Sequence, residues 1–399
     1  MIIKGRYTSA EIFAENIEDA ALQWIRTQCD HPAFEAVKIV QMPDVHAGNS
    51  CNVGTAYRIG TYVNPDHVGV DIGCTVSIHK LSCVVAPEDF ALLDHRIREM
   101  IPAGTDICEK NSLNERELFR FLNSQYQKAR SAAPELISEV TRIDARFISE
   151  MCRRIKLQEG IFYKSLGTLG GGNHFIEYGE DNKTEEGWLT IHCGSRNLGV
   201  KVANHWHNIA RNPKRAQFTG YLWDDALKGY LSDMVVAQAY ALYNHHVIRD
   251  RIFAILKKLC KAKCVESIFT THNYISVCEE YPMLRKGAVN AEKGERFCLP
   301  FNMRDGIAIC IGKGNADWNY SAPHGAGRSM SRNAAKKNIE MKVFEESMAG
   351  IFSTSVCPNT LDESPQAYKP MEDILRMIEP TAEVVALIKP RLNIKDVPK

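Results

Sequence analysis

Short apolar and β-branched segments alternate along this chain with longer stretches of helical periodicity. Segments with the composition of β-strands are Val37–Val45, Thr75–Leu81, Trp188–His192, Ser267–Ile275 and Gly306–Ile311. They border on blocks that are rich in histidine, aspartate, cysteine or glycine. The pattern therefore predicts that polar, reactive side chains gather where strands stop.

Between these strands, apolar residues recur at helical spacing. The spacing predicts helices over Asp89–Met100, Glu115–Ala129, Glu135–Ile155 and Asp224–Leu259. The stretch around 89–156 is expected to be a helical insertion. Towards the carboxyl end, Asn333–Lys395 is predicted to form helices that are interrupted at Pro358, Pro365, Pro370, Pro380 and Pro390.

The domain organisation follows from the absence of any dividing segment. The chain has no linker rich in glycine, serine or proline, and it has no internal repeat. Residues 1–399 are therefore expected to form a single large α+β domain with a mixed β-sheet core and helical insertions. One compact fold is also the simplest way to bring distant polar blocks together.

Composition and charge narrow the class of protein. Apolar residues make up 45% of the chain and charged residues 24%, which is typical of a globular fold. A formal net charge of +1 excludes a uniformly basic nucleic-acid binder but not a local basic groove. The 13 cysteines follow no regular spacing and no long uncharged apolar run occurs, so we expect reduced thiols, a cytoplasmic location and no membrane partner.

A set of potential metal ligands is the most informative chemical feature. Asp71 and Cys74 close one apolar segment. Histidines that lie beside glycine or another small residue follow later in the chain: His174, His192, His272 and His324. Thiolate and imidazole suit Zn²⁺, Fe²⁺ or Mn²⁺, and a thiolate can bridge two ions. The set exceeds what one tetrahedral ion needs, so it predicts a pair of ions suited to phosphoryl chemistry.

Two further features suit phosphate groups. The glycine-rich loop from Gly167 to His174 could direct backbone amides at a phosphate, although it lacks the Lys-Ser/Thr ending of a P-loop. Arg196, Arg328 and Arg332 lie in blocks with serine and glycine, and their guanidinium groups match phosphate oxygens. Taken alone, the loop is equally a tight turn, and each arginine block could instead hold a carboxylate or cap a helix.

Together these blocks resemble one family, the RtcB RNA ligases, which join RNA ends with GTP and Mn²⁺. The matching blocks occur in family order across nearly the whole chain: Met42–His46, Val68–Cys74, Leu166–Glu177, His192–Gly199, His272–Tyr274, Arg285–Ala288, His324–Arg332 and Tyr368-Lys369. The resemblance implies the RtcB-type fold. It also implies a ligase that joins RNA 3′-phosphate or 2′,3′-cyclic phosphate ends to 5′-hydroxyl ends through a His-GMP intermediate, in RNA repair or tRNA splicing.

The resemblance further implies roles for single residues. One Mn²⁺ would be held by Asp71, Cys74 and His174, and the other by Cys74, His192 and His272. His324 would be the nucleophile that attacks the α-phosphate of GTP. Nucleotide-binding residues are expected to be Asn173, Glu177, Asn302, Gly325, Ala326, Gly327, Arg328, Tyr368 and Lys395. RNA phosphates would be bound by Arg196, Arg328 and Arg332, and the implied partners are broken tRNA or rRNA and a small activator of the archease type.

One wall of the implied nucleotide site departs from the family pattern. Where relatives have Pro-Gly-Ser-Met-Gly, this chain has Pro300–Arg304, which places Phe301 and Asn302 at the Gly-Ser pair. Ile307 stands where a guanine-contacting serine is expected. These changes predict weaker discrimination in favour of guanine, because a hydrogen-bond partner of the base is missing.

Three functions therefore stay open. The first is a GTP-dependent RNA ligase, the second a dinuclear metal phosphoesterase that acts on RNA ends, and the third an RNA-binding paralogue that does not complete ligation. A phosphoesterase would not need His324 in its Gly-Ala-Gly setting, and a pure RNA binder would not need the metal ligands.

Overall fold

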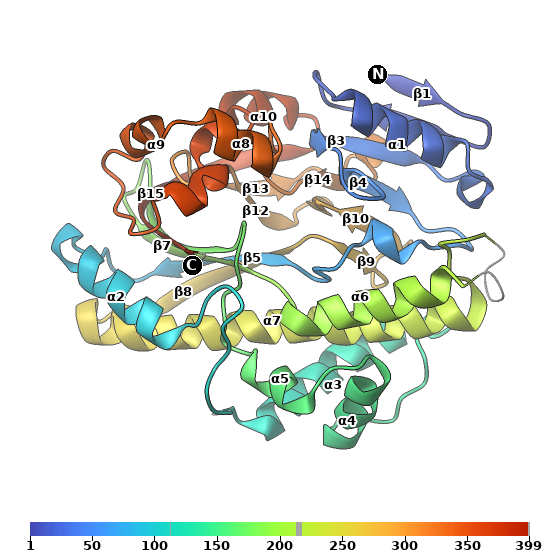
Figure 1. The fold of residues 1–399 in the computed structure, drawn as a ribbon, viewed down its shortest axis with the longest axis horizontal. Coiled ribbons are helices and arrows are strands. Elements are labelled where there is room, and N and C mark those ends of the chain that lie inside the picture. Colours follow the sequence, from blue (N-terminus) through green and yellow to red (C-terminus); the bar gives the residue numbers. More distant parts are fainter. Residues whose placement is uncertain (112, 213–217, 398–399) are drawn as a thin grey trace.

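The computed structural model describes residues 1–111, 113–212 and 218–397, which form an α+β fold around two large sheets (Figure 1). The larger sheet has the strand order β12-β13-β15-β6-β7-β5-β8, and all its neighbouring strands are antiparallel. Its strands are β5 (Thr75–Leu81), β6 (Phe175–Asp181), β7 (Gly187–Cys193), β8 (Cys264–Thr271), β12 (Arg296–Pro300), β13 (Ile307–Gly312) and β15 (Ala382–Lys395).

The second large sheet has the order β1-β2-β3-β4-β10-β9 and is mixed, because β2 and β3 run parallel. Its strands are β1 (Ile2–Lys4), β2 (Ser9–Ile12), β3 (Ile39–His46), β4 (Val53–Arg58), β9 (Tyr274–Ser276) and β10 (Met283–Lys286). A two-stranded sheet pairs β11 (Ala288–Asn290) with β14 (Ser321–Pro323). The predicted α+β class with a mixed sheet core is confirmed.

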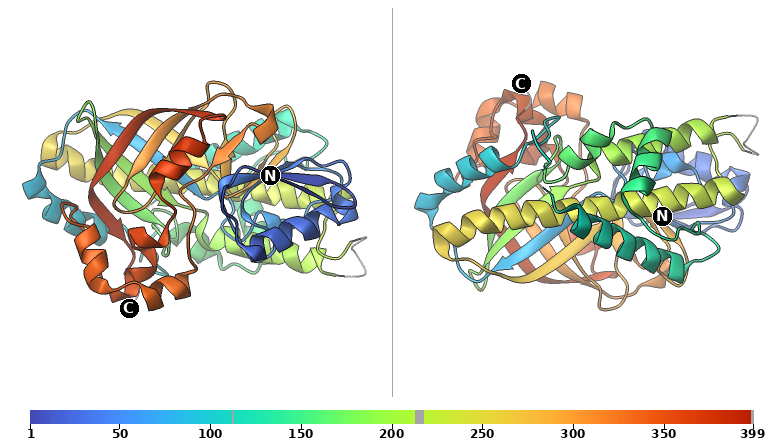
Figure 2. Two further views of the ribbon diagram at one scale, coloured as in Figure 1. Left: turned by 90° about the horizontal axis from the view of Figure 1, so that it is seen from above. Right: turned by 90° about the horizontal axis from the view of Figure 1, so that it is seen from below.

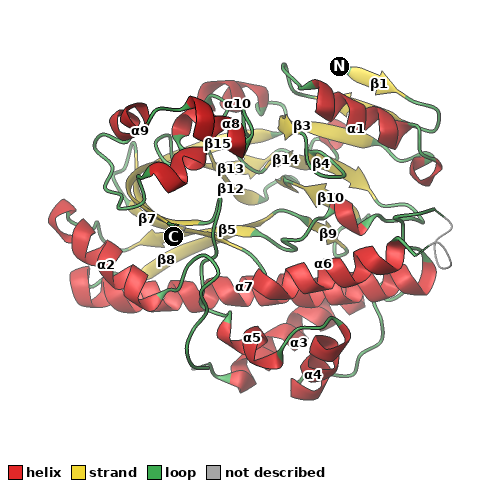
Figure 3. Cartoon of the chain, viewed as in Figure 1, coloured by secondary structure: helices red, strands yellow, loops and turns green. Residues whose placement is uncertain are grey.

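Helices cover the sheets from several sides (Figures 1 and 3). They are α1 (Asp19–Cys29), α2 (Phe90–Met100), α3 (Glu115–Ala132), α4 (Ala145–Arg154), α5 (Glu159–Lys164), α6 (Arg196–Ala210), α7 (Asp224–Cys260), α8 (Arg332–Asn338), α9 (Met341–Ser347) and α10 (Met371–Met377). The predicted helical insertion corresponds to α2, α3 and α4, which lie between β5 and β6 in the chain.

The 37-residue helix α7 runs along nearly the whole length of the molecule (Figure 2). It packs against β5 and β7 on one side and against α3 on the other, so buried side chains occur along it from Leu227 to Leu256. Because two layers cover it, α7 is apolar on more than one face. In the described parts of the chain, no helix combines the length and hydropathy that crossing a lipid bilayer requires.

The carboxyl-terminal prediction of helices up to Lys395 is wrong for its last part. Residues Ala382–Lys395 form β15, a central strand paired with β13 and β6. β-Branched residues such as Val384, Val385 and Ile388 favour a strand. The proline at 390 is tolerated because the pairing with β6 shifts register between Pro390 and Leu392.

Two other predictions need correction. The sequence predicts one helix over Glu135–Ile155, but α4 covers only Ala145–Arg154, because Asp144 is extended and accepts a hydrogen bond from Phe147 N as its N-cap. The sequence also predicts one strand over Ser267–Ile275. That strand is broken at Asn273, which has a left-handed φ of 69° and accepts a hydrogen bond from Gly287 N.

Candidate metal centre and nucleotide pocket

Strand register brings the predicted metal ligands together at one edge of the larger sheet. Cys74 precedes β5, His174 precedes β6, His192 lies near the end of β7, and His272 follows β8. In the antiparallel ladders, Thr75 pairs with both Cys193 and Thr271, and Phe175 pairs with His192. Residues up to 198 positions apart in sequence therefore become neighbours, as the pattern of strand ends predicted.

The thiol of Cys74 lies between two groups of ligand atoms. Its Sγ is 3.5 Å from Nε2 of His174 and 3.2 Å from Nε2 of His192. Nε2 of His174 also lies 3.1 Å from Oδ2 of Asp71, while Nε2 of His192 lies 3.3 Å from Nε2 of His272. Two triads result, Asp71-Cys74-His174 and Cys74-His192-His272, and Cys74 belongs to both.

The protonation of these side chains suits metal coordination. Nδ1 of His192 lies 3.1 Å from the carbonyl oxygen of Asn173, so Nδ1 carries the proton and Nε2 presents its lone pair. Burial lowers the pKa of His192 and His272 well below the ordinary value, which keeps both rings neutral. Burial, followed by the Asp71 carboxylate, raises the pKa of the Cys74 thiol. A cation would reverse that effect and favour the thiolate.

The donor set fits a pair of transition-metal ions. It combines a thiol, three imidazoles and a carboxylate, and the ligand atoms of each triad lie within 4.8 Å of one another. Such mixed N, S and O sites suit Mn²⁺, Fe²⁺ or Zn²⁺ better than Mg²⁺ or Ca²⁺. The structure thus brings together all five predicted ligands around a shared sulfur.

His324 lies beside this cluster and is oriented by a buried carboxylate. The His324 and His272 rings are 4.9 Å apart between centroids. Nδ1 of His324 donates to Oδ2 of Asp44 at 2.6 Å, and the backbone N of His324 donates to the same oxygen at 3.2 Å. Asp44 is fully buried, whereas the His324 side chain is 18% exposed. Nε2 thereby keeps its lone pair unengaged in a fixed ring orientation.

Glycine is required next to this pair. Gly327 has a φ of +72°, and a Cβ there would lie 2.3 Å from the backbone oxygen of Asp44. Lys369 fixes the other side, since its Nζ donates to the carbonyl oxygens of Pro43 and Val45 at 2.9 Å each. The two segments that carry Asp44 and His324 are therefore held in close contact.

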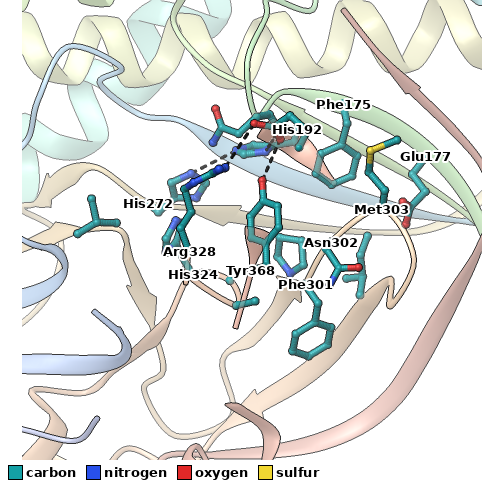
Figure 4. Close-up of a pocket in the computed structure, with 18 of the residues that line it drawn as sticks. Phe175, Glu177, His192, His272, Phe301, Asn302, Met303, His324, Arg328 and Tyr368 are labelled. Carbon is teal, nitrogen blue, oxygen red and sulfur yellow. Dashed lines mark hydrogen bonds and ion pairs between the residues drawn. The ribbon is translucent and has the colours of Figure 1, made fainter. Parts of the chain in front are cut away.

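A cavity of about 310 Å³ opens beside His324, His192 and His272 (Figure 4). All of the predicted nucleotide residues line it: Asn173, Glu177, Asn302, Gly325, Ala326, Gly327, Arg328, Tyr368 and Lys395. Arg332 also lines it, whereas Arg196 is not part of the lining and donates to Thr168 Oγ1 and the Gly104 carbonyl oxygen. The size of the cavity is in the range of small-molecule sites.

One carboxylate, Glu363, organises the basic wall of the cavity. It accepts hydrogen bonds from Tyr368 Oη at 2.9 Å and from Arg332, and its Oε2 lies 3.0 Å from Nζ of Lys395. Burial opposes its charge, but Lys395 and Arg332 outweigh burial and lower the pKa of Glu363 to about 2. Arg328 Nη1 lies 3.7 Å from Oε1 of Glu363 and is buried without a hydrogen bond, so it could still donate to a phosphate oxygen.

The altered wall of the pocket is built around a turn. The Asn302 amide donates to Asp305 Oδ2 at 2.7 Å, and its Oδ1 accepts from the backbone N of Arg304 and Asp305. Its side chain therefore caps the turn. Phe301 and Ile307 also line the cavity, but both are almost fully buried and pack in apolar clusters.

Glu177 contributes a carboxyl group to the cavity from β6. Its Oε2 accepts a hydrogen bond from Nδ2 of Asn393 at 2.7 Å, while Oε1 is buried without a partner. Burial raises the pKa of Glu177 to about 8, although Asn393 and Lys395 act in the opposite direction. Burying this group without a ligand therefore costs stability once it is ionised.

This pKa predicts a pH-dependent gain in stability for Glu177→Gln. From the ordinary Glu pKa of 4.5 up to about 8, the unfolded chain loses the proton while the folded protein keeps it, so wild-type stability falls as pH rises. Without nucleotide, the free energy of unfolding of the variant, relative to that of wild type, should rise by on the order of a few kcal/mol from pH 5 to pH 9. Chemical denaturation at both pH values measures this, and an equal difference at both would contradict it.

Sequence reasoning missed several residues of the site. Asp44, which holds His324, and Lys286, which lines the cavity, lie inside blocks that were singled out, but their roles depend on contacts across the fold, such as Lys286 Nζ donating to the Val68 carbonyl oxygen. Glu363 and Asn393 carry no local sequence signal at all. The role of each can be recognised only from the residues that it contacts in the folded protein.

The comparisons with known proteins agree with the geometry. A family model described as tRNA-splicing ligase RtcB matches residues 30–396. The RNA-splicing ligase RtcB1 of an Escherichia coli strain is 26% identical over 408 residues, covering 94% of this chain and 94% of the relative. The RNA-splicing ligase RtcB of Escherichia coli K12 has the same identity and coverage. The tRNA-splicing ligase RtcB of Aeropyrum pernix is 26% identical over 403 residues, with 85% of this chain and 83% of the relative covered.

Proposed function

Because the chain belongs to the RtcB family, we propose that it joins RNA 3′-phosphate or 2′,3′-cyclic phosphate ends to 5′-hydroxyl ends, with GTP as the activating nucleotide and Mn²⁺ as the metal. The observation that carries the proposal is the His324–Asp44 pair, 2.6 Å apart, beside two metal-ligand triads that share Cys74. Broken tRNA or rRNA is the proposed substrate, acted on in the cytoplasm, and an archease-type activator is the proposed partner.

The first chemical step is the transfer of GMP to His324. The lone pair on Nε2 attacks the α-phosphorus of GTP, a P–N bond forms, and pyrophosphate leaves with the electrons of the broken P–O bond. Asp44 holds the proton on Nδ1 and stabilises the positive charge that the ring acquires. Mn²⁺ ions at the triads would supply positive charge next to the reacting phosphates.

The next steps move GMP to the RNA and then release it. An oxygen of the RNA 3′-phosphate attacks the phosphorus of His-GMP, the P–N bond breaks, and neutral His324 is regenerated. The 5′-hydroxyl of the second RNA then attacks the activated 3′-phosphate and expels GMP. Arg328 and Arg332 at the cavity, and Arg196 beyond it, are the proposed contacts to RNA phosphates.

The two metal-ligand triads would also suit a phosphoesterase, but hydrolysis does not need a nucleotide-sized cavity beside the oriented imidazole, which favours the ligase. A protein that only binds RNA has no use for two triads around one buried thiol.

Incubation with α-labelled GTP and Mn²⁺ tests the proposal. We expect a covalent adduct that is labile to acid and stable to alkali, as P–N bonds are, followed by joining of a cyclic-phosphate RNA to a 5′-hydroxyl RNA. Hydrolysis of the cyclic phosphate at the RNA end, without any labelled protein, would instead support the phosphoesterase.

Ile307 provides a prediction about base selectivity. Ile307→Ser should increase the preference for GTP over ATP in labelling, because a hydroxyl would restore one hydrogen bond worth about 0.5–1.5 kcal/mol. Initial labelling rates with each nucleotide measure the preference, and Ile309→Ser on the same strand is the control for loss of apolar packing. An unchanged ratio would show that another residue already recognises the base.

A further inference from the structure

One face of two neighbouring strands presents four polar or aromatic groups to the cavity. On β6, Phe175 and Glu177 are two positions apart and so point to the same side. On β15, Asn393 pairs with Glu177 and Lys395 pairs with Phe175. All four residues line the cavity. Figure 4 shows Phe175 and Glu177 on one wall, with Met303 beside them.

Two buried oxygens on this face have no partner. They are Oε1 of Glu177 and Oδ1 of Asn393, which belong to side chains that are 2% and 1% exposed. The two groups are joined by the hydrogen bond from Asn393 Nδ2 to Glu177 Oε2 at 2.7 Å. That bond commits the amide nitrogen and so directs Oδ1 away from the carboxylate. Buried acceptors without donors are costly, which indicates that a ligand supplies the donors.

We propose that Asn393 is a specificity-determining residue that accepts a hydrogen bond from the exocyclic 2-amino group of guanine, while Glu177 accepts from the neighbouring ring N–H. This inference rests on the proposed use of the cavity as the GTP site. A planar base stacked on Phe175 would turn its edge towards Glu177 and Asn393, because the three residues lie on the same face of β6 and β15. The guanine edge carries adjacent N–H donors that match two acceptor oxygens.

The same pair disfavours adenine. Adenine has a ring nitrogen acceptor and a C–H group at the positions where guanine has its two donors. Two acceptor oxygens would then face a lone pair and a carbon, and both would stay unpaired. The Asn302 side chain does not serve this role, since it is committed to its own turn.

Inosine triphosphate separates the two contacts, because hypoxanthine keeps the ring N–H and lacks the 2-amino group. Wild type should bind and be labelled by GTP roughly 2- to 10-fold better than by inosine triphosphate. Asn393→Leu, which is similar in size, removes the hydrogen bond to Glu177 for both nucleotides but the contact to the 2-amino group for GTP alone, so it should weaken GTP more than inosine triphosphate and bring their ratio close to one. Glu177→Gln should instead lower the binding and labelling of both GTP and inosine triphosphate relative to ATP.

Affinities of the three nucleotides, measured by calorimetry on the full chain with Mn²⁺, accompany the labelling rates. Thermal unfolding checks that each variant is folded. If Asn393→Leu weakens GTP and inosine triphosphate equally, the amide merely holds Glu177 and the inference is overturned, as it is if neither changes. Selective binding of GTP without labelled protein would uphold the inference and contradict the proposed ligase function, so the two failures are distinguishable.

Discussion

His324→Ala should abolish the covalent attachment of GMP to the protein. Nε2 of His324 is held free and accessible beside the triads, because Nδ1 is engaged by Asp44. Alanine removes the nucleophile but none of the triad ligands, so we expect both metal ions to bind as in wild type. Gel detection of label from α-labelled GTP, with metal analysis of the same sample, measures both. An undiminished adduct would show that another residue is the nucleophile.

Asp44→Asn is the matched test of orientation. It keeps the shape of the buried side chain, removes the charge that stabilises the ring, and can favour the wrong tautomer of His324. We expect labelling to slow by about 10²–10⁴-fold, by analogy with other carboxylate–histidine pairs, without a shift in the nucleotide concentration at half-maximal rate. The variant distinguishes a positioning role of Asp44 from a direct contact with the nucleotide. Loss of a direct contact would raise the nucleotide concentration at half-maximal rate.

Cys74→Ala should lower the occupancy of both metal ions. Its Sγ is the only ligand atom that the two triads have in common, so its loss leaves each ion with two of its protein ligands. His272→Ala belongs to one triad and should chiefly affect one ion. Metal content per protein after dialysis gives the answer for each variant.

Cys193→Ala is the control for removing a buried thiol near the site. Cys193 Sγ accepts from the Asn244 amide and belongs to neither triad, while its carbonyl oxygen is kept in the variant. We expect Cys193→Ala to retain both ions. Retention of both ions with full activity in Cys74→Ala would mean that the sulfur does not bridge.

The tertiary structure corrected the predicted secondary structure mainly where the local sequence pattern is weak. Pro380 precedes the segment Ala382–Lys395 and Pro390 lies within it, which suggests broken helices, yet the segment is a central strand, because neighbours on both sides complete its hydrogen bonds. That strand carries Asn393 and Lys395 into the cavity. A helix there would have left Glu177 without its amide partner.

By itself the sequence determined the chemical content of the site and most of the elements that hold it. Asp71, Cys74 and the histidines are rare reactive types in small-residue settings, and such local signals survive without knowledge of the fold. Only the tertiary structure decided which groups are paired. Asp44 with His324, Glu363 with Lys395, and Asn393 with Glu177 meet across 280, 32 and 216 positions, and no periodicity in the chain encodes such contacts. Burial then decides their protonation, because desolvation depends on the surrounding atoms and not on the neighbours in sequence.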